Sequence, residues 1–378
     1  MKAELLAQYI KQLGIEVLTG VPDSTLKEFC DYINSEETGL VHYTAPNEGS
    51  AVGIAAGTYL STGKPACVYM QNSGIGNTVN PVTSIANAEV YNIPIFFIVG
   101  YRGAPGSKDE PQHKFMGRIT EKIFDCLEIE CKVIDSSVTE SELKEIFCRI
   151  KNVLSNKKQF SLIIKKDTLE KRTNAAYINS YKLNREQVIS GFMKKITEND
   201  LVVSTTGKIS REVYEQSDLI LNHHNQCFLT VGGMGHASMI AFGIARNSPD
   251  KRVICIDGDG AALMHLGNLA FIGKQGIENL VHICLNNDAH ESVGGMPTAA
   301  PNFKYAETAK VCGYSDVFVI QTADEYNSLV NDFNKLKKLT FIEIKVANTS
   351  RDDLIRPKES ALENALNFMN YINKEGLK

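Results

Sequence analysis

The chain has 378 residues, and 40 Lys and Arg against 44 Asp and Glu give it a formal net charge of −4. This length indicates two globular domains, and the near-neutral charge excludes the basic excess of a nucleic-acid-binding protein, so we expect a small-molecule substrate and no nucleic-acid partner. The N-terminal sequence MKAELLAQYI lacks the apolar stretch of a signal peptide, and the apolar run IPIFFIVG is far too short to span a membrane. We therefore predict a cytoplasmic protein that does not associate with membranes.

Two halves of the chain contain the same series of predicted elements at a constant offset of 186 residues. In the first half, a helix of small residues over 49–60 precedes apolar runs at 66–74 and 94–100, with a helical stretch between the runs. In the second half, the corresponding segments are 235–246, 253–260 and 280–286. Short apolar runs that alternate with helices are typical of βαβ units, whose parallel sheets are buried on both faces.

The polar stretch DTLEKRTNAAYINSYKLN is typical of an exposed linker between two domains. It follows a predicted strand over 159–166 and precedes a helix that begins near Arg185. We therefore place the domains at residues 1–175 and 176–378. The predicted fold class is α/β, with two topologically similar three-layer domains, each built on a parallel sheet.

Nine cysteines are dispersed along the chain, without a Cys-x-x-Cys pair or the Cys/His spacing of a zinc site. Such a distribution favours reduced thiols with structural roles. Cys255 and Cys284 lie within apolar runs, where a small buried side chain is a simpler interpretation than a nucleophile.

Polar residues follow two predicted strands of the second half. Gly-Asp-Gly at 258–260 ends one strand, and Asn-Asn-Asp at 286–288 ends the next. In parallel α/β sheets, ligands bind outside the carboxyl ends of the strands, so we expect both segments to face one site. Asp259 and Asn287 offer hard oxygen ligands that suit Mg²⁺ or Ca²⁺, with water and phosphate oxygens in the remaining positions.

The glycines beside Asp259 point to a phosphate ligand. Gly258 and Gly260 let the backbone approach a phosphate closely, and Ala261 begins a helix whose N–H groups favour anions. The alternative is an ordinary strand-to-helix turn in which Asp259 caps the helix, and Gly-Asp-Gly alone does not decide between them.

The first half has no acidic residue at the position that corresponds to Asp259. It offers Glu48 instead, ahead of a helix so rich in Ala and Gly that it must pack closely on its surroundings. We therefore expect Glu48 to lie at a buried surface. Its alternative role is a favourable interaction with the helix dipole.

These residues resemble the thiamine-diphosphate-dependent 2-oxoacid decarboxylase family. The resemblance rests on Glu48 before its small-residue helix, on Gly-Met-Gly at 233–235, and on the 258–260 and 286–287 segments. It covers nearly the whole chain and implies a pyrimidine-binding domain followed by a diphosphate-binding domain of the same topology. The strings VPDSTLKEF, QNSGIGN, YRGAPGSKDEPQHKFMG and NNDAHESVGG are most similar to the phosphonopyruvate decarboxylase branch.

The resemblance implies thiamine diphosphate and Mg²⁺ as cofactors. It gives Glu48 the role of hydrogen-bonding the aminopyrimidine, so that the thiazolium ylid can form and act as the electron sink for decarboxylation. It makes Asp259, Asn287 and the backbone carbonyl of Ala289 the magnesium ligands, and Met234 the wedge between the two cofactor rings, although plain core packing remains open for Met234. The further residues expected to contact the cofactor are Gly207, Gly233, Gly258, Gly260, Ala261 and Ser292.

The resemblance also places acid-base groups around the substrate carbonyl. Asp23, Gln112 and His113 correspond to such positions, and His113 suits proton transfer because an unperturbed imidazole titrates near neutrality. Gln112 departs from the pattern, since some relatives carry a second His there. The sequence offers several candidates for binding the phosphonate group and does not rank them. They are Ser24, Ser73, Gly74, Asn77, Arg102 and Lys208.

The implied reaction is the non-oxidative decarboxylation of 3-phosphonopyruvate to phosphonoacetaldehyde and CO₂ through an enamine, a step of phosphonate biosynthesis. Because the family binds its cofactor across a subunit interface, we expect a homodimer or a larger homo-oligomer. The alternatives left open are a sulfopyruvate decarboxylase, an acetolactate-type carboligase, and a non-catalytic nucleotide or thiamine-diphosphate binding protein. A dinucleotide-dependent oxidoreductase is disfavoured because no Gly-x-Gly-x-x-Gly follows an early strand.

Overall fold

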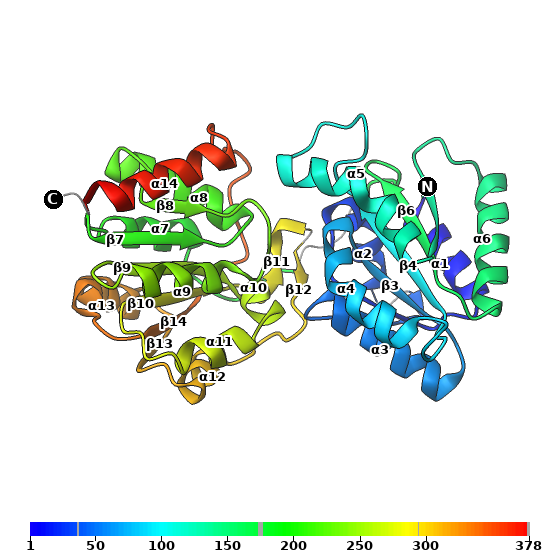
Figure 1. Cartoon of the computed structure of the whole chain (residues 1–378), viewed down its shortest axis with the longest axis horizontal. Helices are drawn as coiled ribbons and strands as arrows, with labels where there is room; N and C mark the ends of the chain where they lie inside the picture. The colour runs from blue at the N-terminus through cyan, green and yellow to red at the C-terminus, as the bar shows by residue number, and fades with distance from the viewer. Residues whose placement is uncertain (36–37, 173–176, 294, 376–378) are drawn as a thin grey trace. The chain divides into compact units, whose positions relative to one another are not determined.

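The structure, a computed structural model, describes residues 1–35, 38–172, 177–293 and 295–375, without the side chains of Ser292, Lys374 and Glu375. It divides into two compact units (Figure 1). Unit 1 comprises Met1–Tyr177 with Ser292–Ala299, and unit 2 comprises Ile178–Glu291 with Ala300–Lys378. The predicted boundary between residues 175 and 176 lies outside the described residues.

Unit 1 is a parallel sheet with helices on both faces. Its strands lie in the order β2-β1-β3-β4-β6-β5, and every neighbouring pair is parallel. The elements in chain order are α1 (Ala3–Gln12), β1 (Val17–Gly20), α2 (Lys27–Ile33), β2 (Val41–Thr44), α3 (Glu48–Thr62), β3 (Ala66–Gln71), α4 (Ile75–Pro81), β4 (Ile95–Tyr101), α5 (Pro111–Cys126), β5 (Glu130–Ile134), α6 (Glu140–Ser155), β6 (Phe160–Lys165) and β12 (Met296–Pro297).

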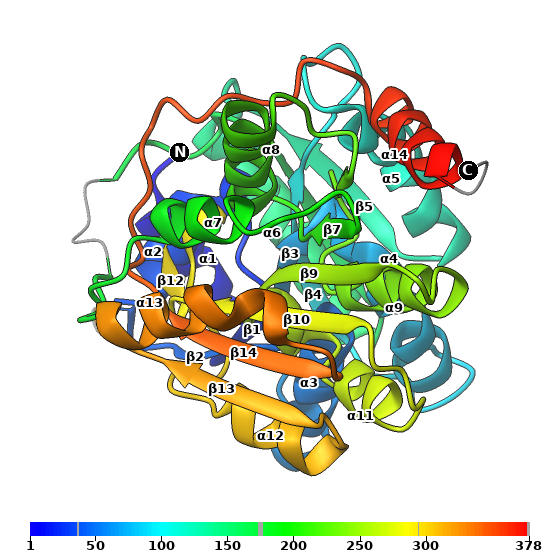
Figure 2. The same cartoon turned by 90° about the vertical axis from the view of Figure 1, so that its left-hand side faces the viewer.

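Unit 2 contains a second parallel sheet, in the order β13-β14-β10-β9-β7-β8, whose successive strands are visible in Figure 2. Its elements in chain order are α7 (Arg185–Met193), β7 (Asp200–Ser204), α8 (Lys208–Leu221), β8 (Cys227–Leu229), α9 (Ala237–Asn247), β9 (Arg252–Gly258), α10 (Asp259–Met264), α11 (Gly267–Gly273), β10 (Leu280–Asn286), β11 (Ala289–His290), α12 (Tyr305–Cys312), β13 (Asp316–Ile320), α13 (Ala323–Asp332), β14 (Thr340–Lys345) and α14 (Ala361–Glu375).

The two sheets have the same topology. Read from the opposite edge, the second sheet runs β8-β7-β9-β10-β14-β13, which matches the first strand for strand. The offset of 186 residues holds in the structure, since β3 begins at Ala66 and β9 at Arg252. The predicted fold class is therefore confirmed.

The central strands are buried on both faces, which explains their nearly continuous apolar runs. In unit 1, Tyr69 and Ile98 belong to a core cluster shared with α1, α2 and α6, whereas Met70 and Val99 belong to a cluster shared with α3 and α5. Unit 2 is built likewise, with α7, α8 and α13 over one face of its sheet and α9, α11, α12 and α14 over the other. Each unit is thus a three-layer structure, and the predicted burial of Cys255 and Cys284 is confirmed.

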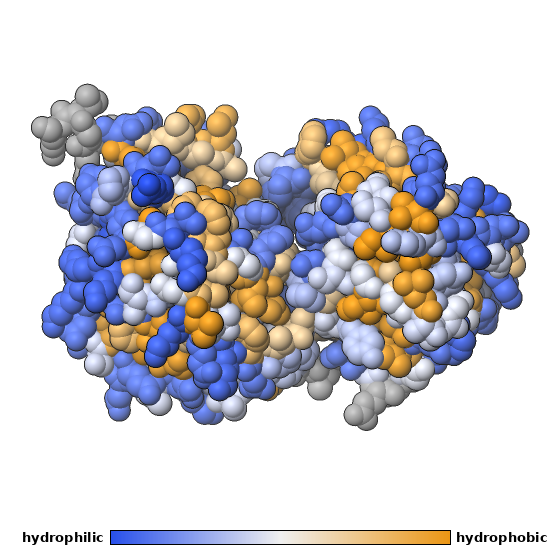
Figure 3. Space-filling model, turned by 60° about the horizontal axis from the view of Figure 1, so that its bottom comes forward, coloured by the Kyte–Doolittle hydropathy of each residue, from blue (hydrophilic) through white to orange (hydrophobic). Residues whose placement is uncertain are grey.

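On the face drawn in Figure 3, both units expose hydrophobic residues between hydrophilic ones. Four of the exposed apolar residues belong to α3, to α4 and to the turns that follow α4, and they are Leu60, Val79, Val90 and Tyr91. Among the residues that the structure describes, no helix is long and apolar enough to cross a membrane.

Candidate active site

The two metal-ligand candidates follow neighbouring strands of unit 2. Strand β9 ends at Gly258 and β10 ends at Asn286, and the two strands are parallel, with Leu285 opposite Gly258. Asp259 and Asn287, the next residues along the chain, therefore lie at the same edge of the sheet.

Asp259 is a buried carboxylate whose hydrogen bonding is incomplete. It is 4% exposed, and its Oδ2 atom has no hydrogen-bond partner among the described residues. Burial raises the pKa of this carboxyl to about 7, although the backbone N–H of Gly260 partly opposes the shift. A buried carboxylate normally requires a cation or donors to remain ionised, so this oxygen is suited to a metal ion.

The side chain of Asn287 is also buried, at 5% exposed. Its Oδ1 accepts a hydrogen bond from the backbone N–H of Ala289 at 3.1 Å, and its Nδ2 donates to Glu291 Oε2 at 3.2 Å. The backbone carbonyl of Asn287 accepts from Asn179 Nδ2 at 2.8 Å. The loop that carries the predicted ligands Asn287 and Ala289 is thus tied at several points.

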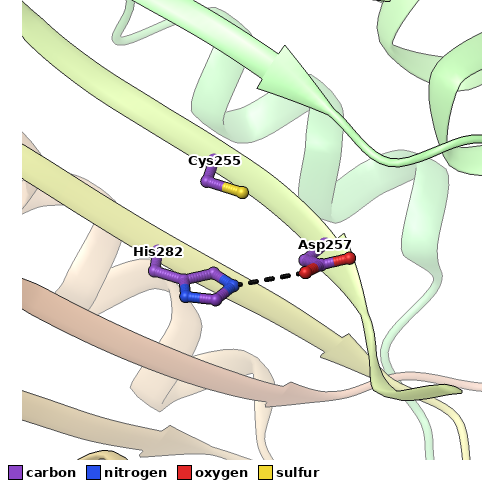
Figure 4. Close-up of side chains that lie close together, drawn as sticks. All are labelled: Cys255, Asp257 and His282. Atoms are coloured by element: carbon purple, nitrogen blue, oxygen red, sulfur yellow. Dashed lines mark ion pairs between the residues drawn. The ribbon is translucent and has the colours of Figure 1, made fainter. Parts of the chain in front are cut away.

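A row of buried polar residues supports both strand ends from within the sheet. Asp257 Oδ1 accepts the N–H of Gly258 at 2.9 Å, and its other oxygen faces the His282 imidazole at 3.5 Å, beside Cys255 (Figure 4). The side chains of Cys255, Asp257 and His282 are all fully buried. The hydrogen bond from Gly258 shows that Asp257 fixes the turn that leads into Asp259.

The last residue of β10, Asn286, supports the second strand end. Its Nδ2 donates to Glu343 Oε1 at 2.9 Å, and its Oδ1 accepts from the backbone N–H of Asp288 at 3.0 Å. Glu343 also accepts from the N–H of Ala306 at 3.0 Å and forms an ion pair with Lys345 at 3.0 Å. The backbone of the loop is therefore anchored through β14 and the start of α12.

The segment that contains Met234 lies over the turn at 258–260. Gly233 and Gly235 adopt the left-handed conformation, with φ of 65° and 86°. A Cβ atom placed on Gly260 would lie 3.4 Å from Met234 Cε and 3.0 Å from the ring of His290, so Gly260 leaves the space that Met234 approaches. Four predicted cofactor contacts, Gly233, Met234, Gly258 and Gly260, thus lie together, and Ala261 follows in the first turn of α10.

Lys208 begins α8, directly after Gly207, which adopts φ of 97°. Its Nζ lies 3.1 Å from Glu291 Oε1 and 2.6 Å from Ser350 Oγ. Glu291 also pairs with Arg185, which forms two 2.8 Å hydrogen bonds with Glu212. Two cations and two carboxylates therefore balance one another in this cluster.

Burial alone would raise the pKa of the Glu291 carboxyl, but the positive charge of Arg185, a hydrogen bond from Ser350 and the charge of Lys208 together lower it below its usual value. Sequence reasoning missed Glu291 and Arg185. The sequence did contain one indication of Glu291, which is an acidic residue only four positions after the predicted ligand Asn287.

In unit 1, Glu48 is the first residue of α3, and it is 5% exposed, which confirms that it lies at a buried surface. Its Oε2 accepts a hydrogen bond from Asn77 Nδ2 at 2.7 Å. A Cβ atom on Gly74 would lie only 2.3 Å from Glu48 Oε1, so the carboxylate lies directly against that glycine. Ser73 is exposed, and its Oγ accepts from Gln71 Nε2 at 2.6 Å.

Asp23 lies fully buried against β4, because a Cβ atom on Gly100 would stand 1.8 Å from its Oδ2. That Oδ2 accepts the N–H of Thr25 at 3.0 Å, whereas Oδ1 has no hydrogen-bond partner among the described residues. Burial raises the pKa of Asp23 to about 6, against the opposing positive charge of Arg102. Asp23 is therefore an acid that can exchange a proton near neutral pH.

Arg102 lies beside this acid and donates to Ser24 Oγ at 3.1 Å. Its Nε and Nη2 atoms also form hydrogen bonds of 2.8 and 2.6 Å with the two oxygens of Asp109. The structure thus brings Asp23, Ser24 and Arg102 together, but it pairs the charge of Arg102 with Asp109, which sequence reasoning missed.

Gln112 and His113 lie in the first turn of α5, and both are half-buried. The helix packs closely on the turn after Arg102, since a Cβ atom on Gly103 would lie 1.9 Å from the carbonyl oxygen of His113. A Cβ atom on Gly117 would likewise lie 1.7 Å from the carbonyl oxygen of Gly103. The remaining predicted contact, the side chain of Ser292, lies outside the described residues.

Comparison with known proteins identifies the family of both units. Residues 2–123 match the thiamine pyrophosphate enzyme N-terminal TPP binding domain, and residues 207–344 match the C-terminal TPP binding domain. The chain is 32% identical over 377 residues to a phosphonopyruvate decarboxylase of Streptomyces viridochromogenes, covering 95% of this chain and 92% of that protein. It is also 32% identical over 376 residues to a phosphonopyruvate decarboxylase of Streptomyces hygroscopicus, covering 95% and 91%.

A sulfopyruvate decarboxylase of Methanosarcina acetivorans is 25% identical over 383 residues, covering 95% of each chain. The first match lies within unit 1, which carries Glu48, and the second covers most of unit 2, which carries Asp259. The chain belongs to the thiamine pyrophosphate enzymes and is a thiamine-diphosphate-dependent decarboxylase of the family that contains the phosphonopyruvate decarboxylases.

Proposed function

We propose that the chain decarboxylates 3-phosphonopyruvate to phosphonoacetaldehyde and CO₂, with thiamine diphosphate held by Mg²⁺. The observation that carries the magnesium-dependent chemistry is the buried Oδ2 of Asp259, which has no hydrogen-bond partner in the part of the chain that the structure describes and lies at the strand edge shared with Asn287. The choice of substrate is supported by 32% identity to two phosphonopyruvate decarboxylases, against 25% for the sulfopyruvate enzyme.

The residues present fit the cofactor. Asp259, Asn287 and the carbonyl of Ala289 would hold Mg²⁺, because carboxylate, amide and carbonyl oxygens are the ligands that this ion prefers. Gly258 and Gly260 leave room for a phosphate beside the start of α10. When bound, thiamine diphosphate supplies the electron sink that makes loss of CO₂ from a 2-oxoacid possible.

The polar side chains of unit 1 would bind the pyrimidine ring, transfer protons and bind the charged phosphonate group. Glu48 is buried and rigidly placed, so it would hold the pyrimidine ring by a hydrogen bond. Asp23, whose pKa is raised to about 6, and His113 would exchange protons with the substrate carbonyl and the product. Ser24 and Arg102, which lie beside Asp23, would face the phosphonate group.

Steady-state assays with both oxoacids test the choice of substrate. We expect kcat/KM to be higher for phosphonopyruvate than for sulfopyruvate, and a far higher value for sulfopyruvate would overturn the proposal. Incubation with pyruvate alone tests the carboligase alternative, for which acetolactate would be the product. Mass spectrometry of the purified protein after denaturation, with thiamine diphosphate among the released molecules, would support the proposed cofactor. Turnover by Glu48→Gln tests the non-catalytic alternative, in which Glu48 is merely structural and its loss leaves the rate unchanged.

We also propose a homodimer, in which unit 1 of one chain and unit 2 of its partner contribute to each active site. The apolar residues exposed on and after α3 and α4 support this proposal, because apolar surface of this kind is typical of subunit contacts. Light scattering combined with an activity assay tests it. An active monomer would refute this arrangement.

A further inference from the structure

The amide group of Asn287 has two chemically different ends, and only the oxygen can bind a magnesium ion. The NH₂ end would turn hydrogen atoms toward the cation. An asparagine that serves as a metal ligand therefore needs a neighbour that distinguishes the two ends. In this chain, the neighbour of the NH₂ end is Glu291, whose Oε2 accepts from Asn287 Nδ2 at 3.2 Å.

A carboxylate is suited to this task because an ionised carboxylate only accepts hydrogen bonds. Glu291 is itself fixed, since Arg185 binds its Oε2 and Lys208 Nζ lies 3.1 Å from its Oε1. The side chains of Arg185 and Glu291 are 4% and 10% exposed, so little water competes for these contacts. The end of the Asn287 amide that faces Glu291 must therefore be the NH₂ group.

The backbone of the same loop is held by other groups. Asn179 binds the carbonyl of Asn287 at 2.8 Å, and Asn286 binds the N–H of Asp288 at 3.0 Å. The side chain of Asp288 accepts a further backbone N–H, that of Asn302, at 2.9 Å. Because these contacts already set the path of the loop, two hydrogen bonds act on the orientation of the Asn287 side chain: the N–H of Ala289 donates to its Oδ1 at 3.1 Å, and its Nδ2 donates to Glu291. The second is the one formed with a side chain, which substitution can change.

We propose that Glu291 is a positioning residue, which turns the amide of Asn287 so that its oxygen faces the magnesium site. The proposal rests on the magnesium site proposed above. In this proposal, Arg185 and Lys208 hold Glu291 in place, and Glu291 orients the metal ligand Asn287. Outer partners of metal ligands commonly have such a role, and their loss lowers metal affinity by about 10- to 100-fold.

The test uses three variants of the full chain: Glu291→Gln, Asn287→Asp and the double variant. Mg²⁺ is titrated into each protein with thiamine diphosphate present, and the rise in unfolding temperature is followed. In Glu291→Gln, the new side-chain amide presents an NH₂ group as well as an oxygen, so it cannot accept from all the donors that surround Glu291. We therefore expect the half-saturating Mg²⁺ concentration to rise about 10-fold.

The double variant reverses the hydrogen bond and keeps the net charge. The amide at position 291 can donate to the carboxylate at position 287, whose other oxygen remains for the metal. We therefore expect the double variant to recover most of the affinity that Glu291→Gln loses. Asn287→Asp alone places two carboxylates against each other and should lower the unfolding temperature measured without Mg²⁺.

Glu212→Gln is the matched control, because Glu212 binds the same Arg185 but forms no hydrogen bond with Asn287. It should lower the unfolding temperature and leave the half-saturating Mg²⁺ concentration unchanged. An equal loss of Mg²⁺ affinity in Glu212→Gln and Glu291→Gln would overturn the proposal. A half-saturating Mg²⁺ concentration in Glu291→Gln equal to that of the wild type would also overturn it. So would Mg²⁺ affinities that follow only the net charge of the variants and become equal in about 1 M KCl, where the screening length is about 3 Å.

Asp259→Ala separates this inference from the function on which it rests. If Asp259→Ala keeps the stabilisation by Mg²⁺, the magnesium site itself is wrong. If Asp259→Ala loses that stabilisation while Glu291→Gln retains it in full, the site stands and only the role of Glu291 is wrong.

Discussion

The ends of β3 and β9 occupy the same place in the two units and carry different chemistry. The offset of 186 residues pairs Gln71–Gly74 with Asp257–Gly260. In unit 2 the turn carries the buried Asp259, one oxygen of which has no hydrogen-bond partner within the described ranges, whereas unit 1 has the exposed Ser73, bound to Gln71. The end of β9 therefore offers a carboxylate oxygen that can bind a cation, whereas the end of β3 carries no charge.

The same offset pairs Glu48 with Met234. Each of these residues lies against the glycine that ends its own unit's turn, Glu48 against Gly74 and Met234 near Gly260. A shared backbone frame thus presents a carboxylate in one unit and a thioether in the other. The difference indicates that a repeated fold fixes where a side chain is placed, while the residue type decides what it does there.

Removal of the charge at the unit 1 position should have the largest effect. In Glu48→Gln the shape of the side chain and an acceptor for Asn77 remain, but the carboxylate is lost. We expect kcat with phosphonopyruvate to fall by about 10²- to 10⁴-fold, the usual contribution of a group that assists proton transfer. Binding of thiamine diphosphate, measured by calorimetry, should change little. An unchanged rate would show that the mechanism is wrong.

Removal of the charge at the unit 2 position should affect binding. Asp259→Ala should lose affinity for Mg²⁺ and thiamine diphosphate together. Loss of a residue that only supports a metal ligand can lower metal affinity by roughly 100-fold, so we expect the loss of the ligand itself to cost at least as much. Calorimetric titration measures both. Ser73→Ala, the equivalent change in unit 1, is the control and should leave the Mg²⁺ affinity unaltered. Similar losses in the two variants would remove the distinction between the strand ends.

The buried acid Asp23 gives unit 1 a pH dependence. Its pKa is about 6 in the folded protein and near 3.8 in the unfolded chain, so the folded protein binds more protons between these values. Stability should therefore fall as the pH rises from about 4 to about 6, by about 2 to 3 kcal/mol for a shift of this size. Urea unfolding of wild type and Asp23→Asn across this range measures the difference. Parallel pH profiles would contradict this assignment.

Much of the fold was predictable because burial on both sheet faces leaves a strong pattern. The strands predicted over 94–100 and 159–166 correspond closely to β4 (Ile95–Tyr101) and β6 (Phe160–Lys165). The helix predicted to begin near Arg185 begins at that residue. The shared edge of Asp259 and Asn287 also followed from the sequence, because neighbouring parallel strands end on the same side.

The ion pairs around the site were not predictable in the same way. Arg185 meets Glu291 across 106 residues of sequence, and Lys208 meets it across 83. No periodic pattern records such a contact, because it depends on which helices pack at the end of the sheet. Arg102 and Asp109 are only seven residues apart, yet their pairing depends on the turn between them. Two candidates for binding the phosphonate, Arg102 and Lys208, therefore form ion pairs, with Asp109 and Glu291, that the sequence did not predict.

The smallest expected effect compares the two glycines of the paired turns. A Cβ atom on Gly74 would come within 2.3 to 2.6 Å of three atoms of the buried Glu48, whereas on Gly260 it would meet His290 at 3.0 Å and Met234 at 3.4 Å. Overpacking of a filled core typically costs about 1 to 3 kcal/mol, so Gly74→Ala should destabilise the cofactor-free protein by about this amount and Gly260→Ala by less. Urea unfolding without cofactor measures both. Equal losses would mean that Glu48 can move aside freely, and the rigid placement on which its role depends would be lost.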